Sequence, residues 1–227
     1  FEFTGLYQNG FAFDKCLEAL TLHPVTWPII KELLSDKPRF AKGSLKHDTH
    51  ENWKQVERAI SNPGGLHCAR DDYGWYSTRY ETKDGRIYCD DFVAFFYFTD
   101  VFPSDGGLIV IPGSHKSEFE RPSNLLTFDE EDGIDPQPHP VFTNITPRAG
   151  DVVFISELLT HGVLRWRPTD RDRRLLVLRY KPQYMGKSSF SSAILDRLSA
   201  ETLELISSVP YHHIKDIVKQ DVVTLTA

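Results

Sequence analysis

The fold of this chain is decided by the stretch Thr160-His161-Gly162-Val163-Leu164-Arg165-Trp166 and by the run Arg173-Arg174-Leu175-Leu176-Val177-Leu178-Arg179-Tyr180, which follows after a short polar loop. The first stretch has a histidine at the end of a strand-like segment, and the second has an arginine at the head of a leucine-rich strand. Histidine is the commonest metal ligand, and a buried arginine can hold an anion through two parallel hydrogen bonds. Together they predict a β-sheet that carries a metal site with an anionic co-substrate.

Short strands separated by turn sequences fill the middle of the chain. Turns are predicted at Lys83-Asp84-Gly85, Pro103-Ser104-Asp105-Gly106-Gly107 and Arg148-Ala149-Gly150-Asp151. The predicted strands are residues 66–69, 73–81, 86–99, 107–111, 141–145, 151–160 and 173–180. Strands this short and this closely spaced are typical of a sandwich or barrel and not of βαβ units. We therefore predict a mainly β fold with flanking helices.

The flanking helices are predicted at both ends of the chain. One has Pro24 in its first turn and ends before Pro38, a short one is expected over residues 51–60, and a third over residues 192–208. With 227 residues, of which 40% are hydrophobic, the chain is expected to form a single domain. Its parts are a helical and connecting region over residues 1–62, a strand core over 64–182 and a helical extension over 183–227. The acidic loop at residues 129–136 is expected to be a solvated insertion or lid.

Composition narrows the class of protein. The formal net charge of -6 argues against a nucleic-acid-binding protein that depends on phosphate neutralisation. Cys16, Cys68 and Cys89 show no CxxC spacing, which favours a reducing compartment over a secreted disulfide framework. No run of 18 apolar residues predicts a membrane span. We expect a soluble, cytoplasmic protein with a small-molecule substrate, and expect the natural chain to begin upstream of Phe1.

Two of the nine histidines stand out because each ends an apolar segment. His67 follows Gly65-Leu66, and His161 follows residues 154–160. A barrel can bring two such strand ends together, and two histidines with one carboxylate on one face form the iron site of non-haem Fe(II) oxygenases. If a 2-oxo acid binds the iron, its far carboxylate needs a buried cation with two donors, a role that suits Arg173. Arg174 points to the opposite face of a regular strand and is the alternative.

A series of short motifs spans residues 64–182. They are Leu66-His67, Asp84-Gly85-Arg86-Ile87-Tyr88, Phe98-Thr99-Asp100-Val101, Asp105-Gly106-Gly107, Ile111-Pro112-Gly113-Ser114-His115-Lys116, Gly150-Asp151-Val152-Val153-Phe154, His161-Gly162 and Arg173-Arg174. In combination they resemble the phytanoyl-CoA dioxygenase family. The resemblance implies a double-stranded β-helix, a cupin-like jelly roll, with Fe(II), 2-oxoglutarate and dioxygen. By motif position it implies His67 and His161 as iron ligands and Arg173 as the residue that binds the 2-oxoglutarate tail.

The sequence departs from the family at the third iron ligand. The family's first motif is His-x-Asp, whereas this chain has His67-Cys68-Ala69. Asp71, or secondly Asp72, can supply the carboxylate if the chain bulges after Ala69; Asp71 is preferred because it keeps the parity of His67. Alternatively chloride binds beside Ala69, as in the iron halogenases that resemble this family, or the site is inactive and the domain only binds.

These alternatives give an order of expected functions. First is an Fe(II)/2-oxoglutarate-dependent dioxygenase that hydroxylates a small organic or acyl substrate, because hydroxylation is the commoner outcome in the family. Second is an Fe(II)/2-oxoglutarate-dependent halogenase. Third is a catalytically silent cupin-like binding domain. In the first two the resemblance implies that iron carries the radical chemistry, while the protein positions the reactants and excludes water.

Overall fold

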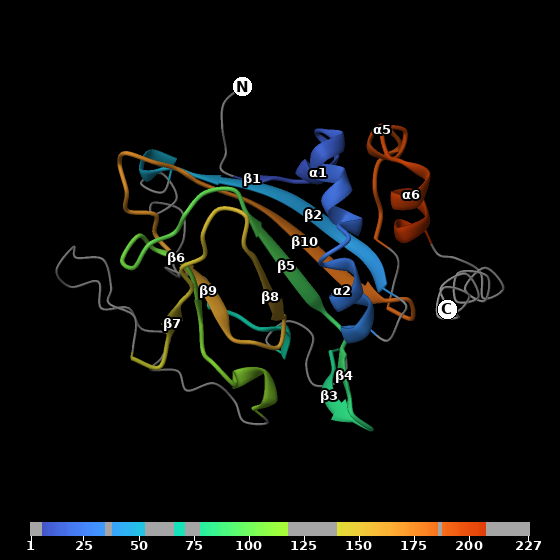
Figure 1. Ribbon diagram of the computed structural model, residues 1–227, viewed down its shortest axis with the longest axis horizontal. Coiled ribbons are helices and arrows are strands. Elements are labelled where there is room, and N and C mark those ends of the chain that lie inside the picture. The colour runs from blue at the N-terminus through green and yellow to red at the C-terminus, as the bar shows by residue number, and fades with distance from the viewer. Residues whose placement is uncertain are drawn as a thin grey trace.

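The computed structural model describes residues 6–34, 38–52, 66–70, 78–117, 140–185 and 188–207. Two antiparallel sheets face each other and a small hairpin projects from them (Figure 1). The large sheet has the order β1-β2-β10-β5-β8, with strands Leu6–Tyr7, Pro38–Asp48, Arg173–Pro182, Phe92–Tyr97 and Val152–Ser156. The small sheet has the order β7-β6-β9, with strands Thr143–Asn144, Gly107–Val110 and His161–Leu164. The hairpin consists of β3 (Tyr80–Lys83) and β4 (Arg86–Cys89).

Short helices cover the outer face of the large sheet. They are α1 (Lys15–Ala19), α2 (Trp27–Leu33), α5 (Ser192–Leu195) and α6 (Ala200–Ile206), with 3-10 turns at Gly10–Ala12 and Leu20–Leu22; a further 3-10 turn, Ser114–Lys116, follows β6. Figure 1 shows both the N-terminal and the C-terminal helices on this side of β2 and β10. The main hydrophobic core lies between these helices and the sheet, and includes Phe11, Ile30, Phe40 and Tyr180. The predicted jelly roll with flanking helices is confirmed.

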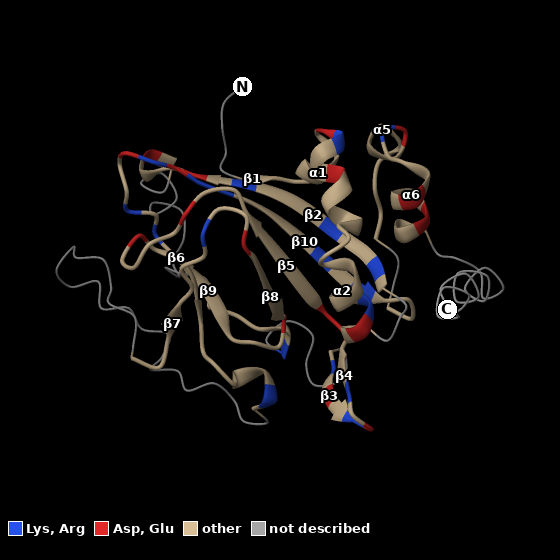
Figure 2. Ribbon diagram, in the orientation of Figure 1, with Lys and Arg blue, Asp and Glu red and all other residues tan. Residues whose placement is uncertain are grey.

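Strand β10 separates two environments because successive side chains point to opposite faces of a sheet. Leu176, Leu178 and Tyr180 point outward into the helix-covered core. The intervening positions point between the two sheets, where Leu175 joins a second apolar cluster that also contains Tyr97, Val101 and Trp166. The same inner face carries the charged residues 173, 179 and 181, and Figure 2 marks Lys and Arg positions in blue along β2 and β10. The interior between the sheets is therefore partly ionic.

Several predicted strands agree with the structure, and others need correction. The strand predicted at 107–111 contains β6, the one predicted at 173–180 lies within β10, and the one predicted at 151–160 contains β8, which ends earlier, at Ser156. The single strand predicted at 86–99 is wrong: β4 ends at Cys89 and β5 begins at Phe92. The break occurs at Asp90 and Asp91, and the carboxylate of Asp91 turns inward to meet two cations of β10. Of the strand predicted at 73–81, only the residues from 78 onward are described, and β3 begins at Tyr80.

The flanking regions also differ from the prediction. The region around residue 40 was expected to belong to a helical and connecting part of the chain, but it contains β2, an 11-residue strand between β1 and β10 in the large sheet. The helix expected from Pro24 begins only at Trp27, and the helix expected over 192–208 is two helices separated by a break in which Ser199 caps α6. Most of the helix predicted at 51–60 and the acidic loop at 129–136 lie outside the described residues. Among the described residues, no helix has the length and apolar character needed to cross a membrane.

Candidate metal centre

His67 and His161 lie directly opposite each other. The two residues exchange both backbone hydrogen bonds, His67 N to His161 O at 2.9 Å and His161 N to His67 O at 3.0 Å, in an isolated antiparallel bridge. Residues paired in this way point to the same side of the sheet. Their imidazole rings accordingly have centroids 4.3 Å apart. The two strand ends that the sequence singled out are therefore side by side, where one ion can contact both rings.

The surroundings of His161 fix which ring nitrogen can bind a metal. His161 Nδ1 lies 2.7 Å from the carbonyl oxygen of Leu159. A carbonyl only accepts a hydrogen bond, so Nδ1 carries the proton and Nε2 keeps its lone pair. Burial lowers the pKa of His161, so that the ring is neutral near pH 7. A neutral imidazole whose second nitrogen donates to a carbonyl is the usual form of a metal ligand.

Glu157 completes a group of three with the two histidines. One potential ligand atom from each of His67, Glu157 and His161 lies within 4.8 Å of the others. Glu157 Oε1 is 4.0 Å from His161 Nε2 and forms an ion pair with Arg179 of β10. Burial opposes ionisation of the Glu157 carboxyl, but the pKa of Glu157 lies below its usual value, chiefly because the charge of Arg179 and its hydrogen bond favour the carboxylate. The carboxylate is therefore available as an anionic ligand.

This donor set fits a non-haem iron ion. Two imidazole nitrogens and one carboxylate oxygen on one side of the ion are the ligands that Fe(II) oxygenases use, and they leave further positions open. Glu157 and His161 are buried, whereas the His67 side is exposed. An ion held by the three residues would thus be anchored on the protein side and accessible on the other.

Asp71 and Asp72, the predicted sources of the carboxylate, lie outside the described residues. Ala69, at the position where the family has aspartate, is 3% exposed, and its backbone N–H donates to the carbonyl oxygen of Glu157 at 2.7 Å. Sequence reasoning missed Glu157. The available signal was an ionisable residue at a strand end, inside the apolar segment that leads to His161 and four residues before it.

A buried ionic network stands behind Glu157. Arg179 Nε is 3.2 Å from Asp91 Oδ1, and Lys181 Nζ is 3.3 Å from Asp91 Oδ2. Asp91 is 1% exposed, and burial raises its pKa even though both cations favour the charged form. Counted together, Asp91 and Glu157 balance Arg179 and Lys181. The network fixes the guanidinium of Arg179 between two carboxylates.

Arg173 occupies the other end of the inner face of β10. It is 2% exposed, and its Nε and Nη2 donate to Asp48 Oδ2 of β2 at 2.8 and 2.5 Å. Lys46, two residues earlier on β2, lies close enough for burial and the charge of Arg173 to lower its pKa. Arg173 is thus paired with one carboxylate, and Lys46 lies within electrostatic range of both Arg173 and Asp48. Arg174, the alternative, points outward, and its side chain is 58% exposed.

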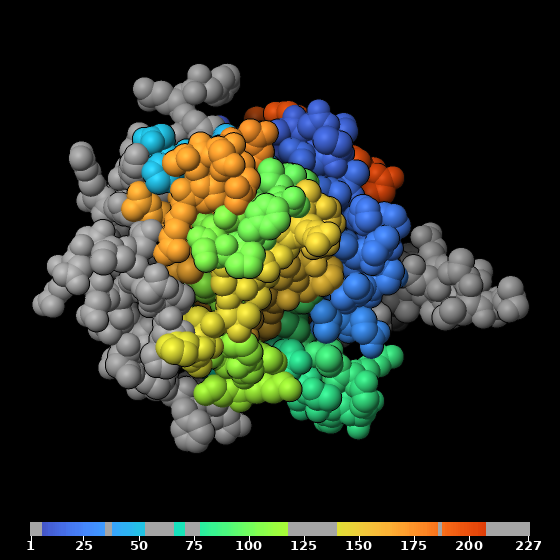
Figure 3. Space-filling view, turned by 60° about the vertical axis from the view of Figure 1, so that its left-hand side comes forward, coloured from blue at the N-terminus to red at the C-terminus, as the bar shows by residue number. Residues whose placement is uncertain are grey.

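The Pro112-Gly113-Ser114-His115 turn is tied to both histidine strands. Ser114 Oγ accepts a hydrogen bond from Thr160 N at 2.8 Å, and Arg70 donates to the carbonyl oxygens of Ser114 and His115. The ring of His115 contacts the ring of Tyr80 in the hairpin edge-on, with the ring centroids 4.5 Å apart. Figure 3 shows this turn, in lime green, against the turquoise hairpin. These contacts hold the turn against the hairpin and the histidine strands.

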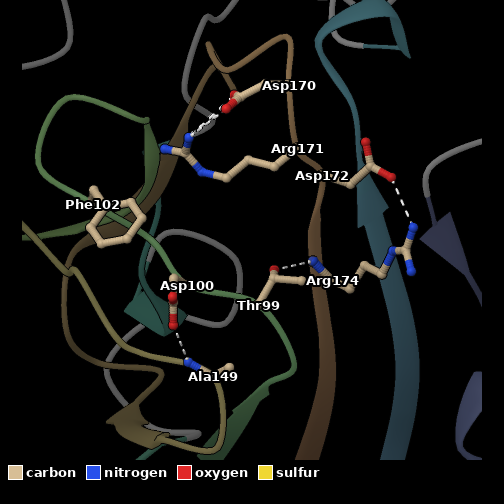
Figure 4. A pocket seen from close by; sticks show the side chains of 8 residues that line it. All are labelled: Thr99, Asp100, Phe102, Ala149, Asp170, Arg171, Asp172 and Arg174. Atoms are coloured by element: carbon tan, nitrogen blue, oxygen red, sulfur yellow. Dashed lines mark hydrogen bonds and ion pairs between the residues drawn. The ribbon is translucent and has the colours of Figure 1, made fainter.

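A separate open pocket of about 540 Å³ lies near the start of β10. It is lined by Thr99, Asp100, Phe102, Ala149, Asp170, Arg171, Asp172 and Arg174 (Figure 4). Its charged side chains already contact partners: Asp170 pairs with Arg171, Asp172 with Arg174, and Asp100 accepts from Ala149 N. None of its lining residues belongs to the His67–Glu157–His161 group, so the pocket gives no evidence about the metal centre.

Comparison with known proteins bears on the class of this site. The family model described as "Phytanoyl-CoA dioxygenase (PhyH)" matches residues 14–174. No curated protein sequence matches significantly.

Solved structures share the fold at low identity. HygX from Streptomyces hygroscopicus with nickel and 2-oxoglutarate bound is 23% identical, with a TM-score of 0.63 over 89% of this chain and 77% of HygX. HygX with nickel, 2-oxoglutarate and hygromycin B bound is 21% identical, with a TM-score of 0.59 over 82% and 72%. The α-ketoglutarate-dependent carbocyclase SnoK from nogalamycin biosynthesis is 19% identical, with a TM-score of 0.53 over 86% and 70%. At these identities the likeness establishes the fold.

Proposed function

Because the chain belongs to the phytanoyl-CoA dioxygenase family, we propose that it is an Fe(II)- and 2-oxoglutarate-dependent dioxygenase that hydroxylates a small organic or acyl substrate. The overall reaction converts substrate, 2-oxoglutarate and dioxygen into hydroxylated substrate, succinate and carbon dioxide. The observation that carries the proposal is the pairing of His67 with His161 beside a buried carboxylate. HygX, which has the same fold, has been solved with iron and with 2-oxoglutarate, the two cofactors expected from the sequence.

In this proposal, residues at one end of the barrel interior bind the metal and residues at the other end bind 2-oxoglutarate. His67 and His161 would hold Fe(II), which supplies the activation of dioxygen when it is bound. Arg173 would bind the far carboxylate of 2-oxoglutarate, and an anion bound there would also favour the charged form of the neighbouring Lys46.

The side chains that line the interior between these two sites are apolar. Leu175 and Val177 lie between Arg173 and Arg179 on the inner face of β10, and Phe95 of β5 packs with them. Apolar side chains at this place exclude water, which strengthens the electrostatic hold on the co-substrate and protects reactive species from side reactions. The protein thus contributes position and exclusion of water rather than further acid–base groups.

The test is the uncoupled reaction, which needs no knowledge of the substrate. Purified protein with Fe(II), 2-oxoglutarate and dioxygen should form succinate above the rate of the His161→Ala variant. Absence of succinate formation, together with absence of Fe(II) binding by the folded protein, would favour the catalytically silent binding domain. The substrate class can then be sought among small natural products and acyl thioesters by their stimulation of succinate formation.

Halogenation remains the second candidate because of one observation, the alanine at position 69. Alanine offers no carboxylate at the position where the family has aspartate, so a chloride ion could serve as the third ligand there. In that case chloride should tighten 2-oxoglutarate binding, and Ala69→Asp should impair chlorination and permit hydroxylation. Binding of 2-oxoglutarate that is unchanged between chloride-free and chloride-containing buffer would argue for the hydroxylase.

A further inference from the structure

We propose that Glu157 supplies the carboxylate of the metal site, in place of a residue that follows His67, and that Arg179 is the residue that positions it. This inference rests on the proposed function, because it concerns the ion that His67 and His161 would hold. It departs from the His-x-Asp pattern, since the carboxylate would come from the segment that carries the second histidine.

The register of the backbone explains how the carboxylate can change strands. His67 is paired with His161, and two residues further on Ala69 N donates to Glu157 O at 2.7 Å. Ala69 and Glu157 are therefore neighbours across the same pair of segments. Position 69 has no carboxylate, but Glu157, the residue hydrogen-bonded to it on the other segment, has one. Glu157 can therefore supply the ligand that the family takes from position 69.

The direction of the Glu157 side chain supports the same assignment. Val153 and Ile155 of β8 pair with Phe95 and Val93 of β5, whose side chains point between the two sheets. Glu157 continues this alternation one step beyond the end of β8 and so points inward. Its Oε1 lies 4.0 Å from His161 Nε2, the nitrogen that the Leu159 hydrogen bond leaves unprotonated.

Arg179 gives this carboxylate its charge and orientation. A buried carboxylate is costly unless a cation or hydrogen bonds compensate it. Arg179 forms an ion pair with Glu157 Oε1, and its own guanidinium is held by Asp91, which Lys181 also contacts. Metal-bound carboxylates are commonly held by a further hydrogen-bond donor of this kind. Arg179 acts through Glu157 and is a positioning residue.

The assignment favours hydroxylation over halogenation. If Glu157 occupies the carboxylate position, the three protein ligands are complete without a halide beside Ala69. Chloride would then have to compete with a tethered carboxylate whose effective concentration far exceeds that of a free anion.

The experiment is an anaerobic titration with Co(II), followed by the visible absorption bands that report its coordination. Wild type, Glu157→Gln and Asp71→Asn are compared, with far-UV circular dichroism as the check on folding. Replacing a second-sphere partner usually weakens metal binding about 10- to 100-fold, so losing a direct ligand should cost at least that much. Asp71→Asn should bind Co(II) within about twofold of wild type, with unchanged bands.

Moving the carboxylate from position 157 to position 69 tests whether Glu157 acts as a metal ligand or only as a structural residue. The double variant Ala69→Asp with Glu157→Gln restores a carboxylate on the other side of the same backbone hydrogen bond, and should recover Co(II) affinity and bands. Arg179→Gln should weaken binding less than Glu157→Gln does and leave the band pattern intact, and Arg179→Lys should recover part of the affinity. If Glu157→Gln does not fold, the anomalous map of Co(II)-loaded wild-type crystals decides, because the peak should lie within bonding distance of a Glu157 oxygen.

Two results would overturn the inference and leave the proposed function standing. One is wild-type Co(II) binding that Asp71→Asn abolishes and Glu157→Gln does not affect. The other is a Co(II) spectrum of Glu157→Gln identical to wild type, which would reduce Glu157 to a structural partner of Arg179. A folded wild-type protein that binds no Co(II) and forms no succinate with Fe(II) would overturn both the inference and the function.

Discussion

Replacing Asp48 tests how much the buried ion pair between Asp48 and Arg173 stabilises the protein. Asp48 is 7% exposed and Arg173 is 2% exposed, and two donors of the guanidinium share Asp48 Oδ2 at 2.8 and 2.5 Å. Asp48→Asn keeps the shape of the side chain but leaves the buried guanidinium without its anion. Breaking a buried pair from one side typically costs about 3–5 kcal/mol. For a chain of this size that corresponds to a fall of roughly 6–20 °C in Tm.

The assay is denaturant or thermal unfolding of wild type, Asp48→Asn, Arg173→Gln and the double variant. The double variant should lose less than the sum of the single losses, because it leaves no orphaned charge. Arg174→Gln is the matched control, since this adjacent arginine pairs with Asp172 at 3.0 Å on the exposed face and should contribute at most about 1 kcal/mol. A loss below about 1 kcal/mol for Asp48→Asn would refute the reasoning.

The same variant connects stability to co-substrate binding. If 2-oxoglutarate places its far carboxylate against Arg173, it replaces the anion that Asp48→Asn removed. Saturation with a ligand at about 100 times its Kd stabilises a protein by roughly 2.7 kcal/mol. The rise in Tm on adding 2-oxoglutarate with metal should therefore be larger in Asp48→Asn than in wild type. An equal rise in both proteins would indicate that the carboxylate binds elsewhere.

Three further changes have defined outcomes. Arg173→Lys should raise the KM for 2-oxoglutarate about 10- to 100-fold in the succinate assay, because one ammonium cannot replace a two-donor guanidinium; an unchanged KM would exclude this residue as the carboxylate anchor. Gly106→Ala should give little folded protein on expression, since φ is +99° and a Cβ would lie 1.8 Å from the backbone oxygen of Arg165; normal yield and Tm would contradict that contact. Glu18→Gln should lower the free energy of unfolding by about 1–3 kcal/mol, because the buried carboxylate accepts from Ser199 N at 2.6 Å at the start of α6; urea unfolding measures it, and no loss would mean that this link between the terminal helices is not stabilising.

The strands that the sequence predicted well are those with an apolar face that repeats without interruption. The run Leu176, Leu178, Tyr180 alternates with inner-face residues along β10, and this pattern is visible without coordinates. Strand β2 was missed because its inner face carries Lys42, Lys46 and other polar side chains, which hide the alternation. The charge on this face is compensated across strands, since Asp48 of β2 accepts from Arg173 of β10, and no local sequence pattern indicates a partner 125 residues away.

The candidate site likewise has features that the sequence predicts and features that depend on the tertiary structure. The sequence by itself determined that His67 and His161 end apolar segments, that Arg173 and Arg174 lie on opposite faces of one strand, and that position 69 has no carboxylate. These properties follow from residue type and from the period of a strand.

Only the tertiary structure determined which side chains lie next to those residues. It brought Glu157 beside the two histidines and gave Arg173 a buried carboxylate partner in Asp48. The physical reason is that proximity across strands depends on register, which is set by the packing of whole sheets. The backbone of Glu157 is hydrogen-bonded to Ala69, two residues after His67, although Glu157 is 90 residues away from His67 along the chain.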